Sequence, residues 1–202
     1  MIYQIRHRTS MEDIVFAVNL YFDGLSLRKT SKALSRFVSR SHTTAIRDWI
    51  EKYKPQRLLS KSKKIAEFIV DETLIKVGSE YVWLWIAIEP ETRQILAVTV
   101  SRERNMLITE RFLSGLIKDY GKHPVSTDGG TWYPQGCEFL KLKHHIHSSL
   151  EKSLIERTIQ YVKDRTESFD DYFPCRKQNC KLEHIKQWIT VFAWHHNNNI
   201  RD

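Results

Sequence analysis

The feature that most constrains the fold of this chain is a change in the spacing of its apolar residues near residue 65. Before that point, apolar residues recur every three or four positions, as they do on one face of a helix. After it, they form nearly continuous runs rich in Val, Ile and Trp that are bounded by turn residues, a pattern typical of buried strands. We therefore expect a helical part at residues 1–54, a basic linker at 55–64 and a mixed α/β part at 65–202.

Three short helices are predicted in the first part. One spans residues 11–22 and ends before Gly24, and Ser26 is expected to cap a second at 27–34. Ser41 is expected to cap a third at 42–53, which Pro55 ends. The predicted inward residues of the first and third helices are Ile14, Ala17, Val18, Tyr21 and Phe22, and Ala45, Ile46, Trp49 and Ile50.

This arrangement is typical of a helix-turn-helix, whose last helix enters the major groove of DNA. The residues placed nearest to the base edges are then His42, Thr43, Thr44 and Arg47. The charge distribution agrees, because residues 1–64 contain 14 Lys and Arg against 5 Asp and Glu, whereas the remainder contains 18 against 19. A basic segment joined to a nearly neutral body favours nucleic acid binding. A structural three-helix bundle with a solubilising surface is the alternative.

The second part is predicted to be a mixed α/β sandwich. Strands at 66–77, 81–89 and 93–100 are separated by short turns and should form an antiparallel meander. Two later strands, near 123–127 and 142–147, can pair in parallel with this sheet. Helices are expected at 104–120, near 131–140 and from about 152 to 165.

Acidic residues stand at unusual places in this part. Asp71 and Glu72 interrupt the first strand, where a buried carboxylate costs several kcal/mol unless it is paired or binds a metal. Asp128 ends a later strand and precedes two glycines, which let the backbone approach a ligand closely. Glu156 shares one stripe of the last predicted helix with Lys163, at the edge of the buried face.

Three carboxylates on adjoining elements offer the hard oxygen ligands that Mg²⁺ and Mn²⁺ prefer. Two such ions about 3.5–4 Å apart activate an attacking hydroxyl and stabilise the leaving oxygen of a phosphodiester. By spacing alone, however, Asp71, Asp128 and Glu156 are more simply explained as unrelated acids with turn-forming or surface roles.

Three segments of the second part carry a family resemblance. They are IVDETLIKVGSEYVWLWIAIEPETRQIL (69–96), STDGGTWYP (126–134) and HSSLEKSLIERTIQYVKDRTESFDDYFPC (147–175). Together they resemble the DDE transposases of prokaryotic insertion sequences, in particular the insertion-sequence-six type and its archaeal members. The likeness covers nearly the whole chain, helix-turn-helix included, and it implies a ribonuclease H-like fold for residues 65–202.

The resemblance also implies an activity and a set of site residues. It makes Asp71, Asp128 and Glu156 the catalytic acids and the ligands of a pair of Mg²⁺ or Mn²⁺ ions. The implied reaction is hydrolysis at the element end, followed by attack of the freed 3′-hydroxyl on target DNA. The implied partners are double-stranded DNA, at element ends and target, and further copies of the chain in a dimer or larger assembly. Lys163 would contact a DNA phosphate, and Trp132 would either stack on a base or belong to the core.

Two alternatives concern the reaction itself. Glu156 follows Asp128 by only 28 positions, which is short for this family, and Glu151 is therefore a second candidate for the third acid. The position of Lys163 relative to Glu156 favours Glu156. A catalytically inactive helix-turn-helix protein with a dimerising α/β domain is the alternative function.

Two further points concern metals and location. The zinc-ligand candidates depart from common structural-zinc spacings, and they are Cys175, Cys180 and His184, with Cys137, His144 and His145 elsewhere. No apolar run approaches the length of a membrane helix, and no signal peptide is recognisable, so a cytoplasmic, nucleoid-associated protein is expected. The polar ending HHNNNIRD fits a frayed tail or a DNA-contacting edge equally well.

Overall fold

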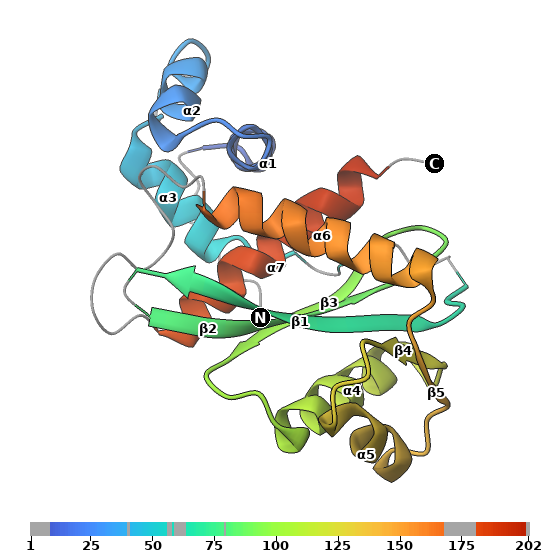
Figure 1. Ribbon diagram of the computed structural model, residues 1–202. Helices are drawn as coiled ribbons and strands as arrows, with labels where there is room; N and C mark the ends of the chain where they lie inside the picture. The colour runs from blue at the N-terminus through green and yellow to red at the C-terminus, as the bar shows by residue number, and fades with distance from the viewer. Residues whose placement is uncertain are drawn as a thin grey trace.

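The fold is a five-stranded sheet with helices on both faces and a three-helix bundle against one side (Figure 1). This computed structural model describes residues 9–39, 41–55, 58, 64–78, 80–167 and 181–200. Most of the predicted linker and the zinc-ligand candidates Cys175 and Cys180 lie outside these residues. Within the described parts of the chain, no helix is both long and apolar enough to cross a membrane.

The N-terminal helices are α1 (Met11–Phe22), α2 (Leu27–Leu34) and α3 (Thr43–Lys52). Ser26 caps α2 as predicted, because its hydroxyl accepts a hydrogen bond from the Lys29 backbone at 3.3 Å. The predicted cap of α3 is wrong: His42 holds the N-cap position without a side-chain bond, and Ser41 is buried one residue earlier. All the predicted inward residues of α1 and α3 are buried.

The sheet has the order β3-β2-β1-β4-β5. Its strands are β1 (Phe68–Val77), β2 (Glu80–Ile88), β3 (Ile95–Ser101), β4 (Val125–Thr127) and β5 (His144–Ile146). The first three strands form the predicted antiparallel meander, whereas β4 and β5 are parallel to β1. The mixed α/β fold class is thereby confirmed, and the strand that carries Asp71 lies directly beside the strand that leads to Asp128.

Two helical layers cover the sheet. One face packs against α4 (Met106–Tyr120) and α5 (Trp132–Phe139), and the other packs against α6 (Ser149–Glu167) and α7 (Leu182–Asn199) (Figure 1). Successive residues of β1 alternate between these layers, with Phe68 and Val70 in the first core and Ile69 and Ile75 in the second.

The helix α7 is absent from the sequence-based prediction. Its apolar residues nevertheless recur with helical spacing, at Ile185, Trp188, Ile189 and Phe192, and all four are buried. The polar ending is mostly part of this helix, and it includes Asn197, whose amide bonds both the N–H and the C=O of Ile95 on β3 at 2.7 and 2.8 Å. Residues 195–199 are therefore helical rather than frayed, and Asn197 joins them to the sheet by hydrogen bonds.

The N-terminal bundle and the sheet share one apolar core. The ring centroid of Phe22 on α1 lies 5.1 Å from that of Trp188 and 6.0 Å from that of Phe192, both on α7. The Trp188 indole N–H donates to the Tyr21 hydroxyl at 3.2 Å. The predicted domain boundary thus marks a change of sequence pattern, but apolar packing continues across it.

Candidate active site

The candidate site is centred on Asp71, in the middle of β1. Its neighbours Ile69 and Ile75 face the α6 layer, and because side chains alternate along a strand, Asp71 faces that layer too. There it lines an open pocket of about 520 Å³ together with Glu156 and Lys163 of α6. One carboxylate oxygen of Asp71 accepts a hydrogen bond from the Glu72 backbone N–H at 2.8 Å.

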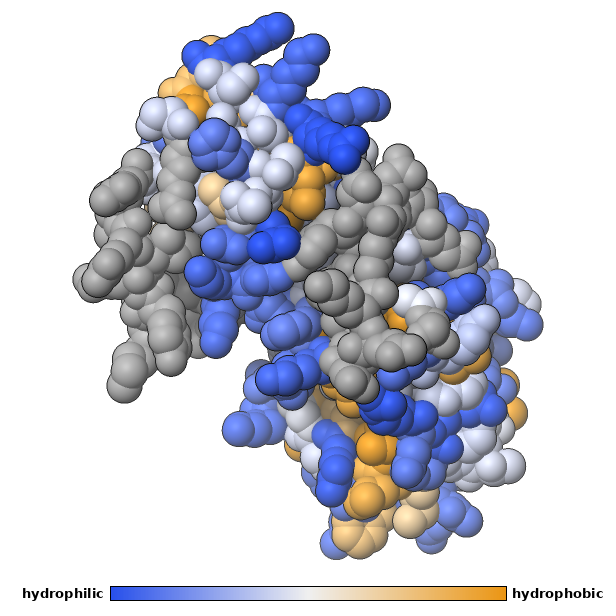
Figure 2. Space-filling view, turned by 90° about the vertical axis from the view of Figure 1, so that its left-hand side faces the viewer, coloured by the Kyte–Doolittle hydropathy of each residue, from blue (hydrophilic) through white to orange (hydrophobic). Residues whose placement is uncertain are grey.

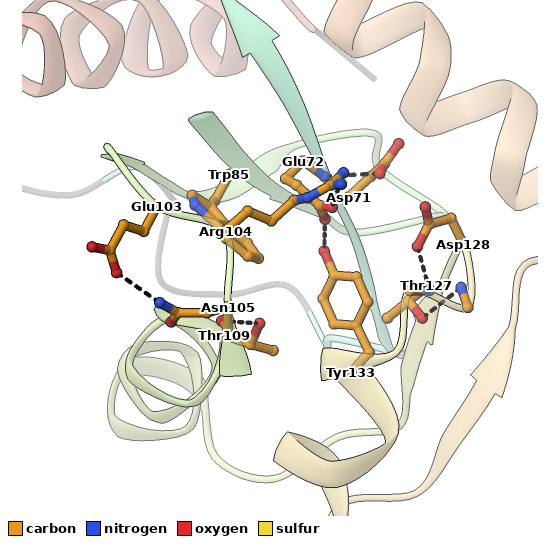
Figure 3. Close-up of polar contacts among 12 residues, drawn as sticks. Asp71, Glu72, Trp85, Glu103, Arg104, Asn105, Thr109, Thr127, Asp128 and Tyr133 are labelled. Atoms are coloured by element: carbon orange, nitrogen blue, oxygen red, sulfur yellow. Dashed lines mark hydrogen bonds and ion pairs between the residues drawn. The ribbon is translucent and has the colours of Figure 1, made fainter. Parts of the chain in front are cut away.

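Asp128 stands at the neighbouring strand end. The parallel register pairs Phe68 with Val125 and Ile69 with Ser126, so the same register extended by two residues brings Asp128 level with Asp71. Asp128 begins a turn in which its own carboxylate accepts the Gly130 backbone N–H at 3.0 Å (Figure 3). Gly129 has a φ of 87°, a conformation that glycine adopts without strain, and it lets the chain reverse directly after the carboxylate.

The surroundings of Asp71 raise the pKa of its carboxyl group. Burial raises it first, and the negative charges of Asp128, Glu72 and Glu156 raise it further, against the effect of the backbone hydrogen bond. The result is a pKa of about 7 instead of 3.8. Such a carboxylate, half-buried among other carboxylates, is where a divalent cation would relieve repulsion. The oxygen donors of Asp71, Asp128 and Glu156 suit Mg²⁺ or Mn²⁺.

Glu156 and Lys163 reach the pocket from the same helix. The burial of Ile155, Ile159 and Val162 fixes the rotation of α6 on the sheet. The Glu156 side chain is 60% exposed, and its carboxylate lies 3.9 Å from the Lys152 ammonium.

Glu151, the alternative third acid, is engaged elsewhere. Its carboxylate accepts hydrogen bonds from the Ser126 hydroxyl at 3.1 Å and the Ser148 backbone at 2.5 Å, and it lies 3.1 Å from His145 Nε2. With Glu67 and His145 it forms a second cluster, whose possible ligand atoms lie within 4.8 Å of one another, a spacing that a cation could bridge.

The two acids of this second cluster have pKa values that are shifted in opposite directions. Burial, reinforced by the Glu151 carboxylate, raises the pKa of Glu67 to about 7. Burial also acts to raise the pKa of Glu151, but hydrogen bonds from the Ser148 backbone, Glu67 and His145 outweigh it and lower the value to about 2.

The predicted DNA-contacting residues lie in three places: Lys163 lines the pocket, and the others lie at α3 and beside the Asp128 turn. At the start of α3, the N-cap residue His42 and Thr44 are exposed, whereas Thr43 and Arg47 are half-buried. Figure 2 shows this side of the molecule, where hydrophilic side chains cover much of the upper, N-terminal part. Trp132 instead lies beside the Asp128 turn, partly buried, with the Arg104 guanidinium 4.4 Å from its ring centroid. A base could stack only on a ring face that Arg104 does not cover.

Glu72 forms a second polar group, on the face of β1 opposite Asp71. The sequence patterns assign it no role. Its side chain points into the α4 and α5 layer and is 1% exposed. It accepts a hydrogen bond from the Tyr133 hydroxyl and lies 3.5 Å from Arg104 Nη1 (Figure 3). The signal available in the sequence is the acid itself, because an unpaired carboxylate would not be stable at this position of a strand.

Cys137 is a poor zinc ligand. It is buried in the apolar core of the α4 and α5 layer, and burial raises the pKa of its thiol to about 11, whereas zinc binds the thiolate. His144 Nε2 lies 2.8 Å from the Thr127 hydroxyl, and His145 belongs to the Glu67–Glu151 cluster.

Comparison with known proteins identifies relatives along most of the chain. Residues 66–196 match the model of a family described as a DDE domain. The uncharacterized protein MJ0017 of Methanocaldococcus jannaschii is 34% identical over 95% of this chain and 88% of its own. A Staphylococcus aureus protein, the transposase for insertion sequence element IS257 in transposon Tn4003, is 29% identical over 79% of this chain and 77% of its own. The catalytic core domain of BIV integrase superposes on 63% of this chain and 82% of its own, with a TM-score of 0.47 and 15% identity.

Proposed function

The chain belongs to the DDE-domain family of insertion-sequence transposases, and from this premise we propose that it binds the ends of an insertion sequence and catalyses metal-dependent cleavage and joining of DNA strands. The observation that carries the proposal is geometric: the register of β1 and β4 brings Asp128 level with Asp71, and Glu156 of α6 lines the same pocket as Asp71. The pocket that Asp71 and Glu156 line is open, so a DNA backbone would have room to enter beside them.

Asp71, Asp128 and Glu156 are the residues that would hold the metal. Bound there, Mg²⁺ or Mn²⁺ would supply Lewis acidity to a scissile phosphate and lower the pKa of an attacking hydroxyl. The chain itself contributes placement: β1 and β4 hold two carboxylates level with each other, and α6 brings the third across the pocket. Lys163, on the same pocket wall, is placed to contact a phosphate of the bound strand.

Recognition of the element ends is assigned to the N-terminal helices. The exposed residues His42 and Thr44, at the start of α3, are those that would meet base edges, and Arg47 would contact DNA one turn later. The docking of this bundle on α7 gives it a defined orientation to the catalytic pocket. Two element ends must meet for strand transfer, so a dimer or larger assembly is the proposed working form.

The test is a cleavage assay on labelled DNA that carries the inverted repeats flanking the gene. Asp71→Asn and Asp128→Asn should abolish cleavage and joining with Mg²⁺ or Mn²⁺, yet bind the same DNA in gel shifts. Glu91→Gln, a change of an exposed acid outside the pocket, is the matched control and should leave all three measurements unchanged. Cleavage by either Asn variant at the wild-type rate would refute the proposal.

The third acid is tested in the same assay. Glu156→Gln should abolish cleavage, whereas Glu151→Gln should retain it, because Glu151 bonds Ser126 and Ser148 away from Asp71. The opposite result would assign the role to Glu151. DNA binding without cleavage by the wild-type chain under any divalent ion would favour the inactive DNA-binding alternative.

A further inference from the structure

The buried acid next to Asp71 has a pairing that metal binding does not explain. Glu72 faces the opposite side of β1 from Asp71, and both of its carboxylate oxygens are used. One accepts a hydrogen bond from the Tyr133 hydroxyl, and the other lies 3.5 Å from Arg104 Nη1 (Figure 3). With 1% of its side chain exposed, Glu72 is kept from water by the first core.

Arg104 is itself held between two indole rings. Its guanidinium carbon lies 4.1 Å from the Trp83 ring centroid and 4.4 Å from the Trp132 ring centroid. Such stacking on two aromatic faces limits the orientations that the side chain adopts. The ion pair to Glu72 therefore has a preorganised partner, and Trp132 is drawn toward β1 through Arg104.

The partners of Glu72 and Arg104 on α5 come directly after the Asp128 turn. Trp132 and Tyr133 are the first two residues of α5, and residues 128–131 are all that separates them from the end of β4. The turn is tightly packed, because a Cβ added to Gly130 would lie 2.7 Å from the Trp132 ring. Only three residues separate Asp128 from Trp132, so the position of Trp132 and Tyr133 constrains the turn that carries Asp128.

Stability alone does not explain a buried ion pair at position 72. An apolar residue at position 72 would fit beside Phe68, Val70 and Trp85, and a buried ion pair is often no more stable than such a replacement. The polar contacts restrain geometry more closely than apolar contacts do. A hydrogen bond favours a narrow range of distance and angle between its two groups, whereas apolar side chains can shift against each other at little cost.

We propose that Glu72, Arg104 and Tyr133 form a positioning clamp that sets the separation of Asp71 and Asp128. The clamp joins β1, at the residue next to Asp71, to α5, at the residues that follow the Asp128 turn. It rests on the proposed function, since the separation matters only if the two aspartates bind a common metal. In this proposal the three residues act through the two aspartates.

The test removes one hydroxyl. Tyr133→Phe keeps the ring, which packs 6.3 Å from the Trp85 ring, but loses the hydrogen bond to Glu72. Tyr120→Phe is the matched control, because it removes a hydroxyl that donates to the Leu96 carbonyl at 2.9 Å in the same helical layer, away from the Asp128 turn. Both variants should lose stability in a chelating buffer, and Tyr133→Phe should lose more, because its lost hydrogen bond is to a buried carboxylate rather than a neutral carbonyl.

Two measurements on full-length protein separate the variants. Titration calorimetry with MnCl₂ should show a Kd about 10-fold or more higher for Tyr133→Phe, and an unchanged Kd for Tyr120→Phe. Hydrogen exchange at the Gly130 amide, which is bonded to Asp128, should accelerate only in Tyr133→Phe. Cleavage by Tyr133→Phe should then recover as the Mn²⁺ concentration is raised.

The outcomes distinguish the clamp from the proposed function. Wild-type Mn²⁺ affinity and wild-type Gly130 exchange in Tyr133→Phe would overturn the clamp while leaving the function intact. If the wild type and Asp71→Asn bind Mn²⁺ equally weakly, the metal-site function is overturned and the clamp has no catalytic role. Weaker Mn²⁺ binding with faster Gly130 exchange, seen only in Tyr133→Phe, would support both.

Discussion

The continuous core between the N-terminal helices and α7 predicts that the whole chain unfolds as one unit. The perturbation that tests this is Phe22→Ala. Phe22 ends α1, is 1% exposed, and packs against the rings of Trp188 and Phe192 on α7. Truncation of a phenylalanine in such a core costs about 3–5 kcal/mol, because it removes apolar contacts and leaves a cavity. This is a large part of the roughly 5–15 kcal/mol that stabilises a typical domain.

The assay is guanidinium unfolding followed by far-ultraviolet circular dichroism and by tryptophan fluorescence. Trp188 reports on the junction with α1, and Trp85 reports on the opposite side of the sheet. In Phe22→Ala, the circular dichroism and the fluorescence transitions should shift together to a lower guanidinium midpoint. Phe16→Ala, on the same helix but 51% exposed, should change stability by less than about 0.5 kcal/mol.

A specific result would refute this reasoning. If Phe22→Ala produced an early transition of the N-terminal helices alone, and left the later transition of the sheet at its wild-type midpoint, the two parts would be independent.

The same mechanism predicts the behaviour of residues 65–202 expressed alone. That fragment would expose the apolar side of α7 that Phe22 covers, and it should be less stable and more prone to aggregation than the full chain.

Two further predictions concern charge. In a chelating buffer, Asp71→Asn should stabilise the fold by up to about 4 kcal/mol at pH 8 and little at pH 4. The folded-state pKa of Asp71 is raised from 3.8 to about 7, so the penalty on its ionised carboxylate grows between these pH values and is complete above them. Urea unfolding at both pH values measures this, and an equal gain at each would contradict it. Lys163→Ala should weaken binding to all DNA sequences alike and reduce the slope of log K against log salt by about 1. Fluorescence anisotropy at several salt concentrations is the measurement, with the exposed Lys76→Ala as control; an unchanged slope would remove Lys163 from the DNA contact.

Local structure was predictable because its causes lie within a few residues of each element. The apolar spacing of α1 and the Ser26 hydroxyl before α2 determine where those helices lie, and both agree with the structure. The position of Asp71 within β1 follows from the apolar run around it. The error at α3 is of the same local kind, since Ser41 and His42 are adjacent and burial of Ser41 moved the cap by one residue.

Which side-chain partners meet was decided only by tertiary structure, because those contacts join residues that are distant in the chain. Both Glu151 and Glu156 lie on α6, and their different surroundings depend on how that helix crosses the sheet. Sequence shows that Glu72 is an acid in a strand, but its partner Tyr133 lies 61 positions away, beyond any local pattern. The docking of α1 on α7 likewise depends on packing, which acts through space, whereas helix and strand propensity acts along the chain.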